Sequence, residues 1–239
     1  MGTLFLVRHA QASFLEANYD QLSQLGEAHA RALGEYWAQR GVIFDRVGVG
    51  PRVRQKDTAR LVSEAFERNS LTFPQPMEFS EFDEYQGEAV LECSLPGLLR
   101  EDQHIRNLHG AFQSAADSVR RRAAFQKLFE AVIGKCAQGE IVPAGGETWP
   151  EFCARVNSGL SEFLSAGRRG ERVAIFTSGG PTAVAVQRAL QLSTERTLQV
   201  SWMSRNSSWS EFLYDAERFT LSSFNSHGHV VDPAMLTYR

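Results

Sequence analysis

Short apolar runs alternate along this chain with segments of helical periodicity, and this alternation constrains the fold more than any other feature. Residues 3–7 and 173–177 are nearly continuous apolar runs, which are typical of strands buried on both faces. Strands that alternate with helices form a mostly parallel sheet with helices on both of its faces. We therefore predict an α/β fold, a three-layer αβα sandwich with a mostly parallel central sheet and a helical insertion.

The expected elements follow one another in chain order. Strands are predicted at residues 3–7, 45–49, about 75–80, 173–177, 209–214 and 218–224, and helices at residues 24–40, from 51 onward, at 148–166 and after 180. Ser23 is expected to cap the first helix and Gly41 to end it, while Pro51 is expected at the first position of the second helix. Residues 97–140 have a helical pattern of mixed charge, and we predict that they form an inserted cap within a single domain of residues 1–239.

The composition excludes several classes of protein. Hydrophobic residues make up 43% and charged residues 22% of the 239 positions, which excludes a wholly disordered chain. A net charge of −3 gives no general attraction to nucleic acid or to an anionic membrane, so neither is expected as a partner. No run approaches the roughly 18–20 apolar residues that a membrane span needs. The first residues also lack the basic region of a signal peptide.

The cysteine pattern favours a reducing compartment. Cys93, Cys136 and Cys153 are odd in number and lack CxxC spacing, so neither a disulfide framework nor a zinc cluster is indicated. We therefore expect the protein to be cytoplasmic.

Polar residues with a common chemical purpose follow four of the predicted strands. They are Arg8 and His9, Arg54, the acidic Glu81 and Glu84, and the helix start formed by Ser178, Gly179 and Gly180. Because the carboxyl ends of parallel strands meet at one edge of a sheet, we expect these groups to lie close together. Guanidinium groups pair with phosphate oxygens, and backbone N–H groups at a helix start favour an anion at the same place.

The same set could catalyse phosphoryl transfer. An imidazole can attack phosphorus, and a protonated carboxyl group can give a proton to the departing oxygen. Phosphoryl transfer depends chiefly on positioning and on charge neutralisation, and fixed cations can supply much of what a metal ion would. We therefore expect no metal ion and no other cofactor.

Two ordered blocks of sequence resemble one known family. Residues 6–13, Leu-Val-Arg-His-Ala-Gln-Ala-Ser, resemble the Arg-His-Gly signature of the histidine phosphatase superfamily, also called phosphoglycerate mutase-like, and residues 19–26 are also typical of it. Residues 50–59 have the superfamily's arginine four positions before Thr-Ala. The resemblance leaves only about 97–140 unmatched. It implies a metal-independent phosphomonoesterase that acts through a phosphohistidine intermediate on a small phosphorylated metabolite.

The resemblance also implies roles for individual residues. The catalytic residues would be His9, Arg8, Arg54 and Glu84, and the substrate-binding residues would be Gln11, Ser13, Ser178 and Gly179. His9 would be the nucleophile, Arg8 and Arg54 would hold the phosphoryl oxygens, and Gln11 and Ser13 would line the mouth of the pocket. The block Asp-Glu-Tyr at 83–85 favours Glu84 as the proton donor, and Glu81 is the alternative.

The chain departs from the superfamily at two positions. Ala10 stands where the signature has Gly, and Ser178 stands where most members place a second histidine, in His-Gly-Gly. A branch of the superfamily resembles Phe-Thr-Ser-Gly-Gly-Pro here, which is the sequence of residues 176–181. A serine hydroxyl can donate a hydrogen bond but carries no positive charge, and losing a charged donor would slow the reaction roughly 10- to 200-fold. His227 or His229 could alternatively fill the place of the second histidine.

The sequence leaves three alternatives to hydrolysis of a phosphomonoester. A phosphoglycerate-type phosphomutase would return the phosphoryl group to substrate, and a catalytically weak regulatory protein would bind a phosphoester without turning it over. A serine hydrolase centred on Ser178 is disfavoured because G-x-S-x-G requires glycine at position 176, which is Phe. The expected partner is a small-molecule phosphoester, and a homodimer is left open.

Overall fold

The computed structural model describes residues 1–13, 20–142, 146–165 and 167–238. The backbone divides into two compact units. The larger consists of Met1–Glu84 with Arg155–Arg239, and the smaller consists of Tyr85–Ala154. In the part of the chain that is described, every helix is too short or too polar to cross a lipid bilayer.

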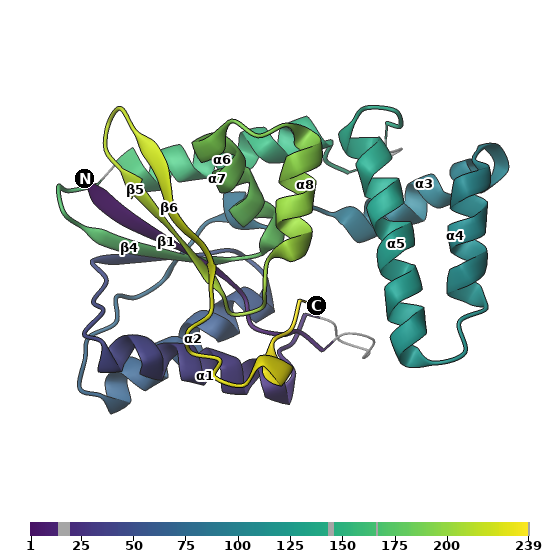
Figure 1. Cartoon of the computed structure of the whole chain (residues 1–239). Helices are drawn as coiled ribbons and strands as arrows, with labels where there is room; N and C mark the ends of the chain where they lie inside the picture. The colour runs from purple at the N-terminus through teal and green to yellow at the C-terminus, as the bar shows by residue number, and fades with distance from the viewer. Residues whose placement is uncertain (14–19, 143–145, 166, 239) are drawn as a thin grey trace. The chain divides into compact units, whose positions relative to one another are not determined.

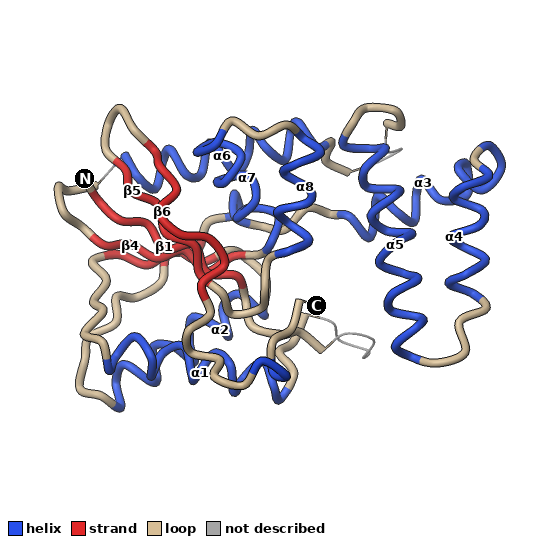
Figure 2. Tube along the Cα trace, viewed as in Figure 1, coloured by secondary structure: helices blue, strands red, loops and turns tan. Residues whose placement is uncertain are grey.

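The larger unit is built on a six-stranded sheet, drawn in red in Figure 2. Its strands are β1 (Gly2–Arg8), β2 (Arg46–Val49), β3 (Met77–Glu78), β4 (Arg172–Thr177), β5 (Trp209–Tyr214) and β6 (Phe219–Ser226), in the spatial order β3-β2-β4-β1-β5-β6. The first four strands in that order pair in parallel, and β5 and β6 are antiparallel to their neighbours. The predicted α/β class with a mostly parallel central sheet is therefore confirmed.

Helices cover both faces of this sheet (Figure 1). They are α1 (Gln24–Gln39), α2 (Val53–Arg68), α6 (Trp149–Ser165), α7 (Gly179–Leu190) and α8 (Thr194–Met203), and α6 begins in the smaller unit. The pair α1 and α2 lies on one face, and α7 and α8 lie on the other. The two helices of the first pair approach closely because α1 has glycine at position 34, where a Cβ atom would lie only 2.6 Å from the Cβ of Ala65.

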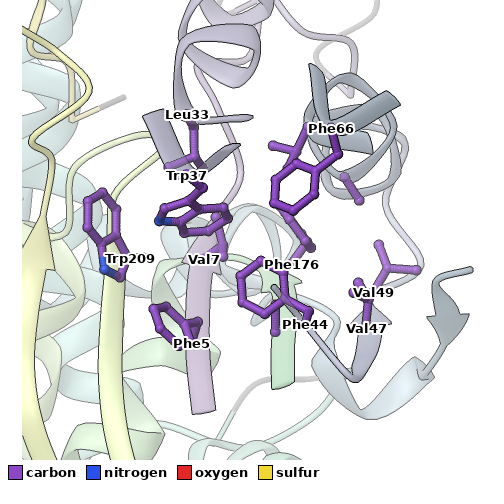
Figure 3. Close-up of a cluster of buried hydrophobic side chains, with 13 residues drawn as sticks. Phe5, Val7, Leu33, Trp37, Phe44, Val47, Val49, Phe66, Phe176 and Trp209 are labelled. Carbon is purple, nitrogen blue, oxygen red and sulfur yellow. The ribbon is translucent and has the colours of Figure 1, made fainter. Parts of the chain in front are cut away.

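An aromatic core fills the space between the sheet and the α1–α2 pair (Figure 3). Its buried members are Phe5, Val7, Leu33, Trp37, Phe44, Val47, Val49, Ala59, Val62, Phe66, Ala174, Phe176 and Trp209. Trp37 packs edge-on against Phe5, Phe44 and Trp209, with ring centroids 5.2–6.0 Å apart. The strand residues in this core belong to β1, β2, β4 and β5, so the cluster holds these four strands together.

The smaller unit contains the helices α3 (Gly87–Glu101), α4 (Gln103–Gln113) and α5 (Ser118–Ala137). Phe125 of α5 packs against Phe112 of α4 and against Phe129 one turn further along α5. Helical structure thus occupies most of residues 97–140, but α3 begins ten residues earlier than that range and continues through Pro96. A cap within a single domain stays a prediction.

The ends of several helices differ in how well local sequence predicts them. Ser23 accepts a hydrogen bond from the Gly26 N–H and Gly41 has φ +63°, so the predicted start and end of α1 are confirmed. The prediction for Pro51 is wrong, because α2 begins at Val53 with Arg52 as its N-cap. The Arg52 N–H donates to Oε1 of Gln55, and the first residue of the helix, Val53, comes two positions after the proline. Helix α8 was not predicted.

Candidate active site

The carboxyl ends of β1, β2 and β4 meet at one edge of the sheet. In the register of the parallel pairs, Arg8 lies opposite Thr177 and Val49 lies opposite Phe176. The backbone continues this register beyond the strands, because the His9 N–H donates to the Thr177 carbonyl at 2.8 Å and the Gly50 N–H donates to the Phe176 carbonyl at 2.9 Å. The residues that follow these strands are therefore gathered together in the larger unit.

His9 is buried, and its ring has a defined orientation. The Nδ1–H donates to the Ala10 carbonyl at 2.7 Å, because a carbonyl oxygen can only accept. The other ring nitrogen, Nε2, accepts from Nε of Arg54 at 3.2 Å. Burial lowers the pKa of His9 well below its ordinary value, and the charges of Arg54 and Arg8 lower it further. The ring is therefore neutral near pH 7 and directs the lone pair of Nε2 toward the guanidinium of Arg54.

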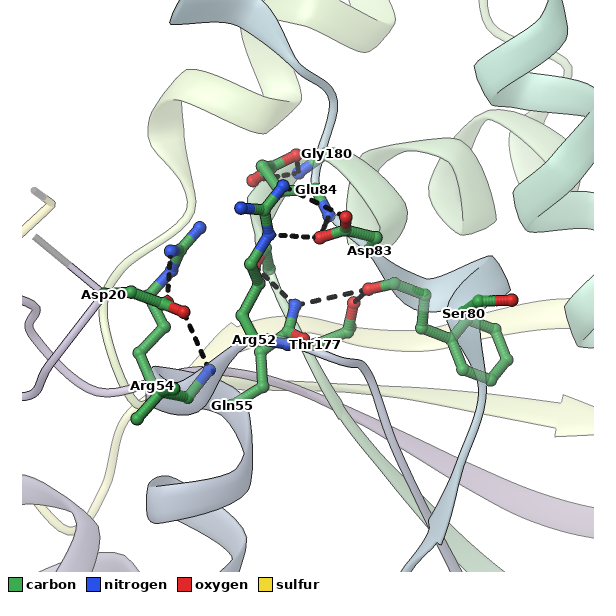
Figure 4. A network of polar contacts seen from close by, with 12 residues as sticks. Asp20, Arg52, Arg54, Gln55, Ser80, Asp83, Glu84, Thr177 and Gly180 are labelled. Carbon is green, nitrogen blue, oxygen red and sulfur yellow. Dashed lines mark hydrogen bonds and ion pairs between the residues drawn. The ribbon is translucent and has the colours of Figure 1, made fainter. Parts of the chain in front are cut away.

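Two guanidinium groups converge near this ring. Arg54 is 5% exposed, and its Nη1 lies 2.7 Å from Oδ1 of Asp20 (Figure 4). Nη1 of Arg8 donates to the Ser204 carbonyl. A Cβ atom at position 179 would lie 3.7 Å from Nε of Arg8, so this guanidinium reaches the start of α7.

Thr58 connects the histidine segment to the helix that carries Arg54. Its hydroxyl donates to the Arg54 carbonyl at 2.7 Å and accepts from the Ala10 N–H at 3.0 Å. The four-residue spacing between the arginine and the threonine puts both on one face of α2. The resemblance includes this spacing, but the residues alone predict no contact for the threonine.

The two candidate proton donors lie in different surroundings. The carboxylate oxygens of Glu84 accept from the Gly180 N–H at 3.1 and 3.3 Å, at the start of α7 (Figure 4). Glu81 packs instead against α6, where a Cβ atom at position 159 would lie 2.4 Å from the Glu81 Cβ. The geometry therefore favours Glu84, which lies at the helix start that follows β4.

An ion pair fixes the backbone just before Glu84. Nε and Nη2 of Arg52 donate to the two oxygens of Asp83 at 2.5 and 3.0 Å, a bidentate arrangement. Oδ1 of Asp83 also accepts from the Glu84 N–H at 2.7 Å. Hydrogen bonding to Asp83 raises the pKa of the Arg52 guanidinium, so Arg52 stays charged. Sequence reasoning missed this pair, because its partners come from separate strand ends.

Gln11 and Ser13, which are expected at the mouth of the pocket, form hydrogen bonds with the segment that leads into α1. Oε1 of Gln11 accepts from the Ser23 hydroxyl at 2.8 Å, and the Ser13 N–H donates to the Gln21 carbonyl at 2.8 Å. Their contact with substrate stays a prediction.

The C-terminal histidines have partners of their own. Nε2 of His229 lies 2.8 Å from the Ser207 hydroxyl, and Nδ1 of His227 lies 3.1 Å from Nη1 of Arg205. Among the described residues, neither ring forms a hydrogen bond with Ser178, whose hydroxyl is bonded to Gln55. The structure therefore gives no support to the proposal that either histidine replaces the missing one.

Burial of His229 predicts a loss of stability in acid. Burial lowers its pKa to about 3, with a smaller contribution from His29 and His227. The unfolded chain, with an ordinary histidine pKa near 6.5, binds a proton that the folded ring does not bind. This contribution to stability is fully present above about pH 6.5 and is lost as the pH falls toward 3, with a slope of about 1.4 kcal/mol per pH unit.

Urea unfolding of His229→Asn between pH 4 and 6 tests this expectation. The free energy of unfolding should depend on pH less steeply than in the wild type, by about one proton. Substitution of His104, which is exposed, is the matched control. An unchanged slope in His229→Asn would contradict the expectation.

The combination of groups at this sheet edge defines a class of site. A neutral imidazole that keeps its Nε2 lone pair, two guanidinium groups and a carboxylate at a helix start can bind and transfer a phosphoryl group. Among the described residues, no three His, Cys, Asp or Glu side chains gather in a way that could hold a metal ion.

Comparison with protein families agrees with this class. The chain matches the family model of the histidine phosphatase superfamily (branch 1) over residues 4–124 and 114–227, and it belongs to this superfamily. A comparison with curated proteins returned no match.

Solved structures with the same fold include two phosphatases and a third protein. A phosphoserine phosphatase mutant from Entamoeba histolytica, in complex with phosphoserine, has a TM-score of 0.65 at 14% identity, covering 97% of this chain and 100% of the other. A mycobacterial glucosyl-3-phosphoglycerate phosphatase has a TM-score of 0.61 at 18% identity, covering 95% and 99%. YhfR of Bacillus stearothermophilus has a TM-score of 0.64 at 16% identity, covering 96% and 99%. At these identities the similarity shows the shared fold alone.

Proposed function

We propose that this protein is a metal-independent phosphomonoesterase that transfers the phosphoryl group of a small phosphorylated metabolite first to His9 and then to water. The observation that carries the proposal is the state of the His9 ring, which is neutral, buried and held at Nδ1 while Nε2 meets Arg54 at 3.2 Å. A nucleophile must keep its lone pair, and a depressed pKa keeps it at neutral pH.

In the first step, the lone pair of His9 Nε2 forms a bond to phosphorus while the bond from phosphorus to the alcohol oxygen breaks. The Nε–H of Arg54, which meets Nε2 in the unliganded site, turns to a phosphoryl oxygen, and Arg54 and Arg8 together neutralise the phosphoryl oxygens. The protonated carboxyl group of Glu84 gives its proton to the departing oxygen. The ring then carries positive charge, which the hydrogen bond from Nδ1–H to the Ala10 carbonyl stabilises.

In the second step, water attacks the phosphorus of the phosphohistidine. The Glu84 carboxylate accepts a proton from this water while the water oxygen bonds to phosphorus, and the bond from Nε2 to phosphorus breaks. Inorganic phosphate leaves, the ring is neutral again, and Glu84 is protonated for the next turnover. A single carboxyl group thus serves as acid and then as base.

Hydrolysis of p-nitrophenyl phosphate in the presence of EDTA tests the proposal. We expect the rate to be unchanged by the chelator, because protein cations hold the phosphoryl group. Loss of activity with EDTA would count against a metal-independent reaction. Transfer of the phosphoryl group to phosphoglycerate instead of water would identify a phosphomutase.

Ser178 supports a second candidate function, a regulatory protein that binds a phosphoester without turnover. Its hydroxyl cannot supply the positive charge of a histidine at this position. Stopped-flow measurement with p-nitrophenyl phosphate separates the two candidates. Steady turnover supports the phosphatase, whereas tight binding of orthovanadate with no release of nitrophenol supports the regulatory protein.

A further inference from the structure

Ser178 occupies the N-cap position of α7 but does not cap the helix. A serine at this position ordinarily accepts a hydrogen bond from the N–H of the second or third helical residue. Here the second is Gly180, whose N–H is bonded to Glu84, and the third is Pro181, which has no N–H. The oxygen of Ser178 is therefore available for a different partner.

That partner is Gln55, a fully buried residue of α2. Its Oε1 accepts from the Arg52 N–H at 3.0 Å, and its Nε2 donates to the Phe82 carbonyl at 3.2 Å and to the Ser178 hydroxyl at 2.8 Å. The two backbone partners fix the orientation of the amide, because an N–H can meet only its oxygen and a carbonyl only its nitrogen. Toward Ser178, Gln55 is therefore a donor.

The surrounding backbone holds the amide of Gln55 in place. A Cβ atom at position 50 would lie 2.2 Å from Oε1 of Gln55, so glycine is needed there for the amide to occupy its position. The Phe82 carbonyl also accepts from the Thr177 hydroxyl at 2.8 Å (Figure 4). One buried amide thus connects the start of α2, the segment before Glu84 and the end of β4.

These contacts determine what the Ser178 hydroxyl can do. Its oxygen accepts from Gln55, so its proton must point toward another acceptor. Within the described part of the chain, the hydrogen bond to Gln55 is the one that this hydroxyl makes. The side chain of Ser178 is buried, and a buried donor without an acceptor costs free energy. Ser178 also directly follows Thr177, whose carbonyl accepts from the His9 N–H, so the two residues lie at the same edge of the sheet.

We propose that Gln55 is a positioning residue that directs the hydroxyl proton of Ser178 to a phosphoryl oxygen, in the place where most of the superfamily has a histidine. This inference rests on the proposed function. Gln55 touches no substrate and acts through Ser178. In this chain an oriented neutral donor therefore replaces a charged one.

A double-mutant cycle tests the proposal with Ser178→Ala, Gln55→Glu and the combined variant. Glutamate has the shape of glutamine, and its ionised carboxylate offers only acceptors, so the hydroxyl would turn and donate to it; Gln55→Met, which has no amide donor and no charge, checks the result if the buried carboxyl group is protonated. We expect Ser178→Ala and Gln55→Glu each to lower kcat for p-nitrophenyl phosphate by roughly 10-fold or more. Both single variants lose the same hydrogen bond, from the Ser178 hydroxyl to a phosphoryl oxygen. The combined variant should therefore be about as slow as Gln55→Glu alone.

Multiplied losses in the combined variant would overturn the proposal, since they would show that the two residues act independently. If Gln55→Glu fails to fold, Gln55→Met takes its place, and folding is monitored by thermal unfolding. The affinity for orthovanadate provides a second readout, which should fall in the same non-additive pattern. If the wild type binds vanadate without turnover, the proposed function fails, and the vanadate cycle still decides the role of Gln55.

Discussion

In the His9→Ala variant, turnover of a phosphomonoester is expected to fall by about 10⁴-fold or more, which is the scale of losing a covalent nucleophile. Alanine offers no lone pair at the place that Nε2 occupies next to Arg54. The guanidinium groups and the start of α7 remain, so binding of inorganic phosphate should persist. The loss should therefore appear in kcat, with little change in phosphate affinity.

Steady-state kinetics measure the loss in kcat, and calorimetry measures the affinity for inorganic phosphate. Rapid quenching of the wild type should reveal a phosphorylated peptide that contains His9 and that is absent from the variant. His29→Ala is a matched control, because His29 is also buried and burial lowers its pKa as well. A His9→Ala variant that keeps more than about one hundredth of the wild-type rate would exclude His9 as the nucleophile.

Substitution of Glu84 by Gln is expected to slow the hydrolysis of an alkyl phosphate by about 10²- to 10³-fold, within the range of a positioned general acid. Glutamine keeps the shape and can still accept from the Gly180 N–H, but it cannot release a proton to the departing alkoxide. Nitrophenolate leaves without a proton. The loss with p-nitrophenyl phosphate should therefore be much smaller when formation of the phosphohistidine limits the rate.

The dependence on the leaving group distinguishes a proton donor from a residue that only shapes the site. Glu81→Gln is the matched comparison, because Glu81 has the same chemistry and precedes Glu84 by three residues. We expect Glu81→Gln to change both rates by less than about threefold, since its side chain packs against α6. If Glu81→Gln carried the leaving-group effect and Glu84→Gln did not, the assignment would be reversed.

Much of the framework follows from local patterns in the chain. The apolar runs of β1 and β4 are typical of buried strands, and the side chain of Ser23 and the positive φ of Gly41 bound α1 through local contacts. The general geometry of parallel sheets then predicts Arg8, His9 and Arg54 at one edge from the sequence alone. These features depend on neighbours in sequence or on a rule that holds for every such sheet.

The finer chemistry depends on which strands are neighbours, and local patterns do not encode strand order. Because β4 lies between β2 and β1, Gln55 meets Ser178 across 123 residues of chain, and Arg54 meets His9 across 45. The N–H of Gly180 likewise binds Glu84, which is distant in sequence, and α7 therefore has no cap from the side chain of Ser178. A buried polar group must find a partner somewhere, but the identity of that partner is settled only when the packed core brings distant segments within hydrogen-bonding distance.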